Sequence, residues 1–178
     1  MHLHRNIDSQ RVPIVARTEK QSLGDWGEKK VSELCFCPSC KRSKTMKLLP
    51  PNFKCADLIC DFCGYLSQVK TCTVSDVNTI PRQILGAAWE PQRERMEAAI
   101  YFSLYLVLSL KDRSDFSIYF LSKDLQEDAM FVPRKPLSPA AKRAGWQGYL
   151  LQLDNVRGRF VRLFWSAGQN LAPLDQSY

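Results

Sequence analysis

The chain has 178 residues, of which 45% are hydrophobic and 24% are charged, and its formal net charge is +7. This length allows one domain with a real core, and the composition is ordinary for a soluble globular protein. The longest apolar run covers residues 98–110 and is too short to span a bilayer. We therefore expect a protein without a membrane-spanning segment.

The positive charge is concentrated late in the chain. Residues 134–162 contain seven Lys or Arg side chains and a single acid, Asp154. A basic excess of this kind favours a polyanionic partner such as nucleic acid, and a merely solvated basic surface is the plain alternative.

The cysteines and the N-terminus indicate the compartment. The opening "MHLHRNIDSQ" lacks the apolar region of a secretory signal peptide. Seven cysteines, an odd number, fit a cytoplasmic protein whose thiols bind metal or stay reduced.

Residues 1–20 show no clear periodicity and are expected to form a loose N-terminal arm or an edge strand. "SLGDWGEKKVSELCF" predicts a short amphipathic helix capped by Ser22, with Trp26, Val31 and Leu34 as its apolar stripe. The segment 75–92, with its Pro and Gly residues, is typical of loop and turn, and "EPQRERMEAA" predicts a second helix.

The second half of the chain predicts strands over 100–110 and 116–121, joined by "KDRSD". "PLSPAAKRAGW" predicts a helix that Ser138 caps and Gly145 ends. "GYLLQLDNVRGRFVRLFW" predicts a hairpin that turns near 155–158, and residues 171–178 form a tail. The simplest account is one α+β domain over 1–178.

Two pairs of cysteines have metal-ligand spacing. "CPSC" and "CDFC" are 19 residues apart, which is typical of a structural Zn²⁺ site with four thiolate ligands. The predicted ligands are Cys37, Cys40, Cys60 and Cys63, within a zinc-binding insert over 37–63. Cys35 is an alternative donor, but the two-residue spacing from Cys37 to Cys40 closes the tighter turn.

The second cysteine pair lies between an acid and an alternating Gln/Lys pair. If 54–59 and 64–71 are antiparallel strands and the turn centres between Phe62 and Cys63, Asp57 lies opposite Gln68. Lys70 then shares a face with Gln68, because alternate residues of a strand point the same way. The metal turn would fix this register, since a slip of one residue moves both side chains to the other face.

An acid followed about ten residues later by [E/Q]-x-Lys resembles the motif of PD-(D/E)xK nucleases. "CPSC…ADLICDFCGYLSQVK" together with "RKPLSPAAKRAGWQG" resembles the catalytic domain of the DpnI and Dam-replacing family of restriction endonucleases over roughly residues 20–165. The resemblance implies a mixed sheet flanked by helices, with an embedded four-cysteine zinc site. It also implies Mg²⁺-dependent hydrolysis of phosphodiester bonds in double-stranded DNA.

Carried over to this chain, the resemblance makes Asp57 and Gln68 the magnesium ligands and Lys70 the motif lysine. Glu28 is the candidate for a further acid on the first helix, with a solvated helix glutamate as the alternative. Arg134, Lys135, Lys142 and Arg143 are the candidate DNA contacts. An amide is a weaker ligand than a carboxylate, so Gln68 leaves open an altered metal demand or a loss of cleavage.

Two other functional interpretations of the sequence stay open. A zinc-containing DNA-binding protein that keeps the nuclease fold without cleavage is the runner-up, and an RNA-binding zinc-ribbon protein is the third. The endonuclease after which the family is named also carries a C-terminal winged-helix domain that reads methylated DNA, and this chain ends soon after the part that resembles the catalytic domain. Methylation dependence is therefore open, and cleavage of both strands would favour a homodimer.

Overall fold

The computed structural model describes residues 18–51, 53 and 55–168, which form a mixed α+β fold with two sheets. The six-stranded sheet has the order β1-β2-β3-β5-β6-β9, and the three-stranded sheet has the order β4-β8-β7. The strands of the larger sheet are β1 (Met46–Leu48), β2 (Leu58–Cys60), β3 (Leu66–Thr73), β5 (Ser103–Ser109), β6 (Phe116–Leu121) and β9 (Val161–Trp165). Those of the smaller sheet are β4 (Gln83–Ala88), β7 (Phe131–Pro133) and β8 (Gly148–Gln152).

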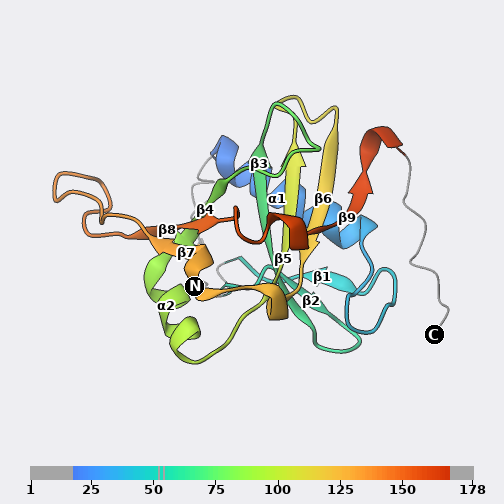
Figure 1. Ribbon diagram of the computed structural model, residues 1–178, viewed down its shortest axis with the longest axis horizontal. Coiled ribbons are helices and arrows are strands. Elements are labelled where there is room, and N and C mark those ends of the chain that lie inside the picture. The colour runs from blue at the N-terminus through green and yellow to red at the C-terminus, as the bar shows by residue number, and fades with distance from the viewer. Residues whose placement is uncertain (1–17, 52, 54, 169–178) are drawn as a thin grey trace, which may run out of the picture.

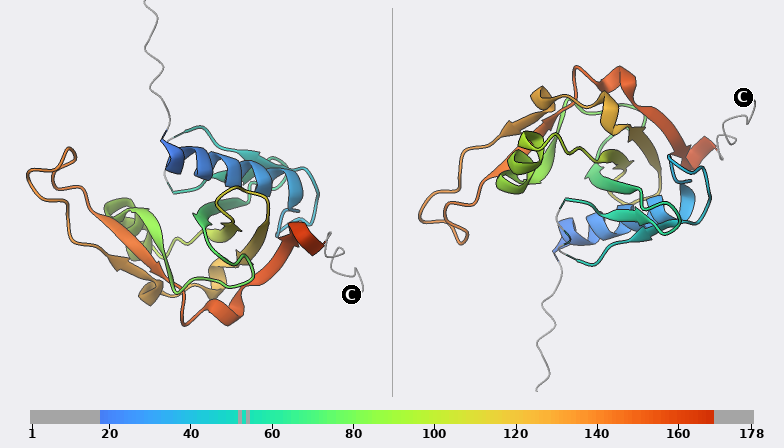
Figure 2. Two further views of the ribbon diagram at one scale, coloured as in Figure 1. Left: turned by 90° about the horizontal axis from the view of Figure 1, so that it is seen from above. Right: turned by 90° about the horizontal axis from the view of Figure 1, so that it is seen from below.

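Two α-helices, α1 (Glu19–Leu34) and α2 (Trp89–Glu97), accompany these sheets. Short 3₁₀ turns span Lys123–Leu125, Asp128–Met130, Arg157–Arg159 and Ser166–Gly168. In Figures 1 and 2, α1 lies on one face of the larger sheet, and the smaller sheet with α2 lies on the other side. None of the helices in the described part of the chain is long and apolar enough to cross a membrane.

Helix α1 begins earlier than predicted. Its N-cap is Thr18, whose side chain accepts a hydrogen bond from the Gln21 backbone N–H, while the Gln21 side chain accepts one from the Thr18 N–H. This reciprocal pair satisfies two N–H groups that have no partner within the helix, which the predicted cap at Ser22 would not do. The expected N-terminal arm therefore stops before Glu19, and its residues up to 17 lie outside the described part, as does the predicted tail.

The inner face of α1 packs closely on β3. Val31 is buried, and Trp26 meets the ring of Phe116 edge-on with centroids 5.2 Å apart, whereas Leu34 is 38% exposed and leaves the predicted stripe incomplete. A Cβ atom added at Gly27 would lie 1.9 Å from Oγ1 of Thr71. The absence of a side chain at position 27 thus sets how near the helix approaches the strand.

Replacing Gly27 with Ala is expected to lower the free energy of unfolding by about 1–3 kcal/mol, because the new methyl group must displace the half-buried side chain of Thr71, whose Oγ1 atom is buried. Gly24→Ala is the matched control, since its added Cβ would meet nothing within 4 Å. That variant should gain about 0.5–1 kcal/mol from helix propensity. Urea unfolding measures the stability of both variants. If Gly27→Ala is as stable as Gly24→Ala, the close approach of α1 to β3 at Gly27 is contradicted.

Strand β5 is the centre of the larger sheet, and all of its residues are buried. It pairs parallel with β3 and antiparallel with β6. Alternate residues supply two apolar clusters: Leu104 and Leu106 face the smaller sheet, and Tyr105 and Val107 face α1. The strands predicted over 100–110 and 116–121 are therefore present, the first shortened at both ends.

Two predictions about local structure are wrong. The segment 75–92 contains strand β4, which pairs antiparallel with β8. The hairpin predicted over 148–165 does not form, because β8 belongs to the smaller sheet and β9 pairs with β6 in the larger one. Each strand finds its partner far away in sequence, and local signals do not indicate such partners.

The helix predicted over 136–146 is also absent. β7 and β8 continue outward as a ribbon, in which the Arg134 N–H donates to the Gly148 carbonyl at 2.9 Å and the Leu137 N–H donates to the Trp146 carbonyl at 2.9 Å. We call residues 134–147 the basic arm, and Figures 1 and 2 show it reaching away from the body of the protein. Its tip has no apolar surface to pack against, and short isolated helices are only marginally stable in water.

Candidate active site and metal centre

The four predicted cysteines come together at one end of the larger sheet. The Sγ atoms of Cys37, Cys40, Cys60 and Cys63 all lie within 4.8 Å of one another. Cys37 Sγ is 3.6 Å from Cys63 Sγ, and Cys40 Sγ is 3.7 Å from Cys60 Sγ. Four sulfurs about 2.3 Å from one tetrahedral Zn²⁺ lie about 3.8 Å apart, so this donor set fits zinc.

The two cysteine turns have the same backbone structure. The Lys41 N–H donates to the Cys37 carbonyl at 2.9 Å, and the Gly64 N–H donates to the Cys60 carbonyl at 2.9 Å. Lys41 and Gly64, each directly after the second cysteine of its pair, have φ values of 62° and 74°. Glycine adopts this left-handed conformation without cost. Each turn therefore presents two sulfurs to the same side, as a shared metal ion requires.

The thiols of the cluster differ in their surroundings. Burial raises the pKa of Cys37 to about 12. Burial also acts to raise the pKa of Cys60, but hydrogen bonds from the Thr45 side chain and from backbone N–H groups bring it down to about 6. Cys35 lies outside the cluster, at the end of α1, where burial raises its pKa to about 12. The structure thus groups the cysteines that the spacing selects and leaves Cys35 apart.

Asp57 lies directly before β2, beside the part of β3 that carries Gln68 and Lys70. Leu58 pairs with Ser67 across the two antiparallel strands, which is the predicted register, and the ladder ends at this pair. The Asp57 N–H donates to the Ser67 carbonyl at 2.9 Å, and the Val69 N–H donates to Asp57 Oδ2 at 2.7 Å. This carboxylate is thereby anchored at the edge of β3, just before the start of β2.

Gln68 and Lys70 share one face of β3, and α1 lies on the other. Thr71, which points opposite to Lys70, is the residue that Gly27 of α1 approaches. Glu28 is half-buried on that same helix. To join the other three residues it would have to reach around the strand edge where Asp57 lies, so its role stays a prediction.

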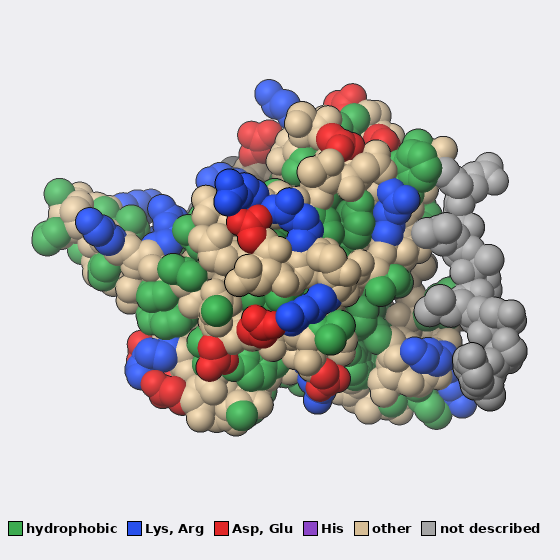
Figure 3. All heavy atoms as spheres, viewed as in Figure 1, with side chains coloured by type: hydrophobic (Ala, Val, Ile, Leu, Met, Phe, Trp, Pro, Cys, Tyr) green, Lys and Arg blue, Asp and Glu red, His purple; other side chains and the backbone are tan. Residues whose placement is uncertain are grey.

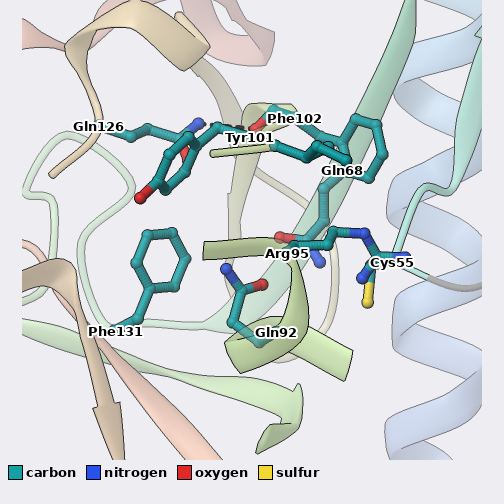
Figure 4. Close-up of a pocket in the computed structure, with 9 residues that line it drawn as sticks. Cys55, Gln68, Gln92, Arg95, Tyr101, Phe102, Gln126 and Phe131 are labelled. Carbon is teal, nitrogen blue, oxygen red and sulfur yellow. Dashed lines mark hydrogen bonds between the residues drawn. The ribbon is translucent and has the colours of Figure 1, made fainter. Parts of the chain in front are cut away.

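The amide of Gln68 is turned toward the protein interior. Gln68 is 7% exposed and lines a small cavity of about 10 Å³ beneath α2, together with Gln92 and Arg95. Figure 4 shows these side chains meeting there. Burial raises the pKa of the neighbouring Tyr149 to about 12, against the opposing effect of a hydrogen bond with Gln68. The sequence did not predict a role for Gln92 and Arg95, because no local sequence pattern indicates that α2 and β3 contribute to one cavity.

The predicted DNA contacts all lie on the basic arm and are exposed: Arg134, Lys135, Lys142 and Arg143. No Asp or Glu occurs between Asp128 and Asp154. The guanidinium of Arg143 lies 4.5 Å from the centre of the Trp146 ring. Figure 3 shows the arm as a projection with basic and hydrophobic side chains on its surface. A projection with exposed cations and no acid suits contact with a polyanion.

A comparison with known protein families matches residues 3–162 to the family described as "DpnI: Dam-replacing family". The match covers most of the chain and includes the four cysteines, the pair Asp57 and Gln68, and the basic arm. It agrees with the structural features assembled above. The chain therefore belongs to the DpnI, Dam-replacing family.

Proposed function

We propose that this protein is a Mg²⁺-dependent endodeoxyribonuclease of the PD-(D/E)xK type. Membership in the DpnI family indicates a restriction-type nuclease that acts on DNA. The observation that supports the finer assignment is the hydrogen bond from the Val69 N–H to Asp57 Oδ2, because Val69 lies between Gln68 and Lys70 on β3. The family match supports the class of reaction, and the geometry of the structure supports the choice of residues.

In this proposal, Asp57 Oδ1 and the Gln68 amide oxygen would hold Mg²⁺, which usually takes only one or two carboxylates from a protein. When bound, the ion supplies Lewis-acid chemistry at the phosphate and an activated water. The backbone N–H of Val69 fixes the Asp57 carboxylate by its other oxygen. Lys70 would orient the attacking water and offset negative charge that develops on the phosphate.

The four-cysteine site would then be structural. Four thiolates close the coordination shell of zinc and leave no position for a substrate. Cys60 ends β2, and Gly64 is two residues before β3, so a bound zinc would clamp the turn that joins the strands of the active site. The metal would thereby keep Asp57 in register with Gln68.

The basic arm is the proposed DNA contact. Replacing both Lys135 and Lys142 with Ala should weaken DNA binding and make the slope of log K against log salt shallower by about 1.8, close to 0.9 for each lost phosphate contact. Arg82→Ala is the control, because this exposed cation pairs with Asp154 away from the arm. Filter binding from 50 to 300 mM salt measures the slope, and an unchanged slope would contradict a role for the arm.

The proposed activity can be tested with supercoiled plasmid, methylated or unmethylated, in Mg²⁺, Mn²⁺, Ca²⁺ or chelator. We expect nicking in Mg²⁺ or Mn²⁺ and none in chelator, and the two plasmids decide methylation dependence. Binding without cleavage in every metal would instead favour an inactive DNA-binding protein, which the neutral Gln68 makes the second candidate. An RNA substrate in the same assay tests an RNA-directed function.

Three further assignments belong to the same proposal. A single domain is supported by the apolar cluster that β4 and β8 share with β5 and β6. A cytoplasmic location follows from a function on cellular DNA and from thiolate metal ligands. A homodimer would supply two active sites for cleavage of both strands, and sedimentation of the protein with and without DNA tests it.

A further inference from the structure

Helix α2 brings two polar side chains to the cavity beside Gln68. Gln92 and Arg95 are three residues apart, so they lie on the same face of the helix. Both line the cavity with Gln68 and Cys55. In Figure 4, Gln68 enters from β3 while Gln92 and Arg95 come from α2. The surroundings of the proposed active site therefore extend beyond the β2–β3 hairpin.

Several contacts hold Arg95 in this position. Its NH1 group donates to the Pro91 carbonyl at 3.1 Å, and its guanidinium carbon lies 5.3 Å from the centre of the Phe102 ring. The Arg95 backbone carbonyl accepts a hydrogen bond from the Ile100 N–H at 2.8 Å, just past the end of α2. A guanidinium that is already packed and oriented loses little side-chain freedom when it binds an anion.

The chemistry of the cavity favours an anion. Its lining includes the guanidinium of Arg95 and the amides of Gln68, Gln92 and Gln126, and no carboxylate among the described side chains. A glutamate at position 68 would place a negative charge beside Arg95 and partly neutralise it. The neutral Gln68 adds no such negative charge to the cavity.

We propose that Arg95 is a further catalytic residue, which binds a non-bridging oxygen of the scissile phosphate. This inference rests on the proposed nuclease function. In the hydrolysis, a water oxygen bonds to phosphorus, the bond to the leaving sugar oxygen breaks, and that oxygen takes up a proton as the water loses one. Negative charge grows on the phosphate oxygens in the transition state, and a fixed guanidinium stabilises it there.

The test compares Arg95→Ala and Arg95→Lys with the control Arg93→Ala. Arg93 lies on the same helix, but it pairs with Glu90 and Glu97 on the exposed side. Single-turnover cleavage in Mg²⁺ should fall about 10²–10³-fold in Arg95→Ala, as for other lost transition-state donors, and Arg95→Lys should recover part of the rate. Arg93→Ala should stay within about threefold of the parent rate, and circular dichroism shows whether each variant is folded.

A second readout does not need cleavage. In Ca²⁺, Arg95→Ala should make the salt dependence of DNA binding shallower by about 0.9, the value for one lost phosphate contact. If Arg95→Ala cleaves like the parent while Lys70→Ala is inactive, the role of Arg95 is overturned and the nuclease function stands. If the parent protein does not cleave at all, the nuclease function fails, and an unchanged salt slope then overturns the phosphate contact of Arg95 as well.

Discussion

Lys70→Ala is expected to reduce Mg²⁺-dependent DNA cleavage by about 10²–10³-fold while leaving DNA binding nearly unchanged. Lys70 shares its face of β3 with Gln68, and Val69 between them donates its backbone N–H to Asp57 Oδ2. Its main contribution comes in the transition state, when charge on the phosphate increases. The loss should therefore appear in the rate of the chemical step and much less in the dissociation constant of the DNA.

Single-turnover kinetics with excess enzyme separate these two quantities. Lys47→Ala serves as the matched control, because Lys47 lies on β1 of the same sheet and pairs with Asp61 at an exposed position. It should cleave at the parent rate. A Lys70→Ala variant that cleaves as fast as this control would contradict the role proposed for the motif lysine.

Loss of the four-cysteine metal is expected to have the largest effect on stability. Zinc binding by four thiolates is worth about 10–16 kcal/mol in small zinc peptides at neutral pH, and binding energy of this kind is folding energy. Cys37 and Cys60 are buried in the apolar cluster that also contains Met46, Leu58 and Val31 of α1. A variant that cannot hold the metal should therefore loosen β1, β2 and the packing of α1 together.

Cys60→Ser should contain less than one zinc per chain and melt at a markedly lower temperature than the parent. It should also lose cleavage, because β2 no longer holds Asp57 beside β3. Cys72→Ser is the control, since Cys72 is a half-buried thiol outside the cluster. Atomic absorption and thermal unfolding measure both effects. Stoichiometric zinc and an unchanged melting temperature in Cys60→Ser would show that the four cysteines are not the metal site.

The parts of the fold that could be predicted from the sequence rest on local rules. The spacing of the cysteine pairs is such a rule, because a turn of fixed length determines where two sulfurs point. The register of β2 against β3 follows by counting from the centre of the turn, and the structure has it for Leu58 with Ser67. At Asp57 the ladder has ended, and its N–H donates to the Ser67 carbonyl, so its place opposite Gln68 stays a prediction. Helix α1 was found as an element, but its start was not, because Thr18 and Gln21 form a better cap than Ser22.

The rest depends on contacts between distant segments. Strand β4 contains Gly86, and in the sequence this glycine favours a turn. In the structure, a Cβ atom at this position would lie 2.2 Å from the Tyr149 ring. That glycine marks a close approach between β4 and β8, and β8 is more than 60 residues away along the chain. In the same way, Gln92 and Arg95 of α2 line a cavity with Gln68 of β3 only through the tertiary fold, so no motif in the sequence indicates them.

The central claim is that Asp57 and Gln68 together hold a divalent cation. Crystals soaked in Mn²⁺ test this directly, because manganese gives an anomalous signal that zinc does not share at a suitably chosen wavelength. The account predicts one manganese peak between the Asp57 carboxylate and the Gln68 amide oxygen, which disappears in Asp57→Asn. A peak elsewhere, or a Gln68 amide that keeps its hydrogen bond with Tyr149 and binds no ion, would contradict it.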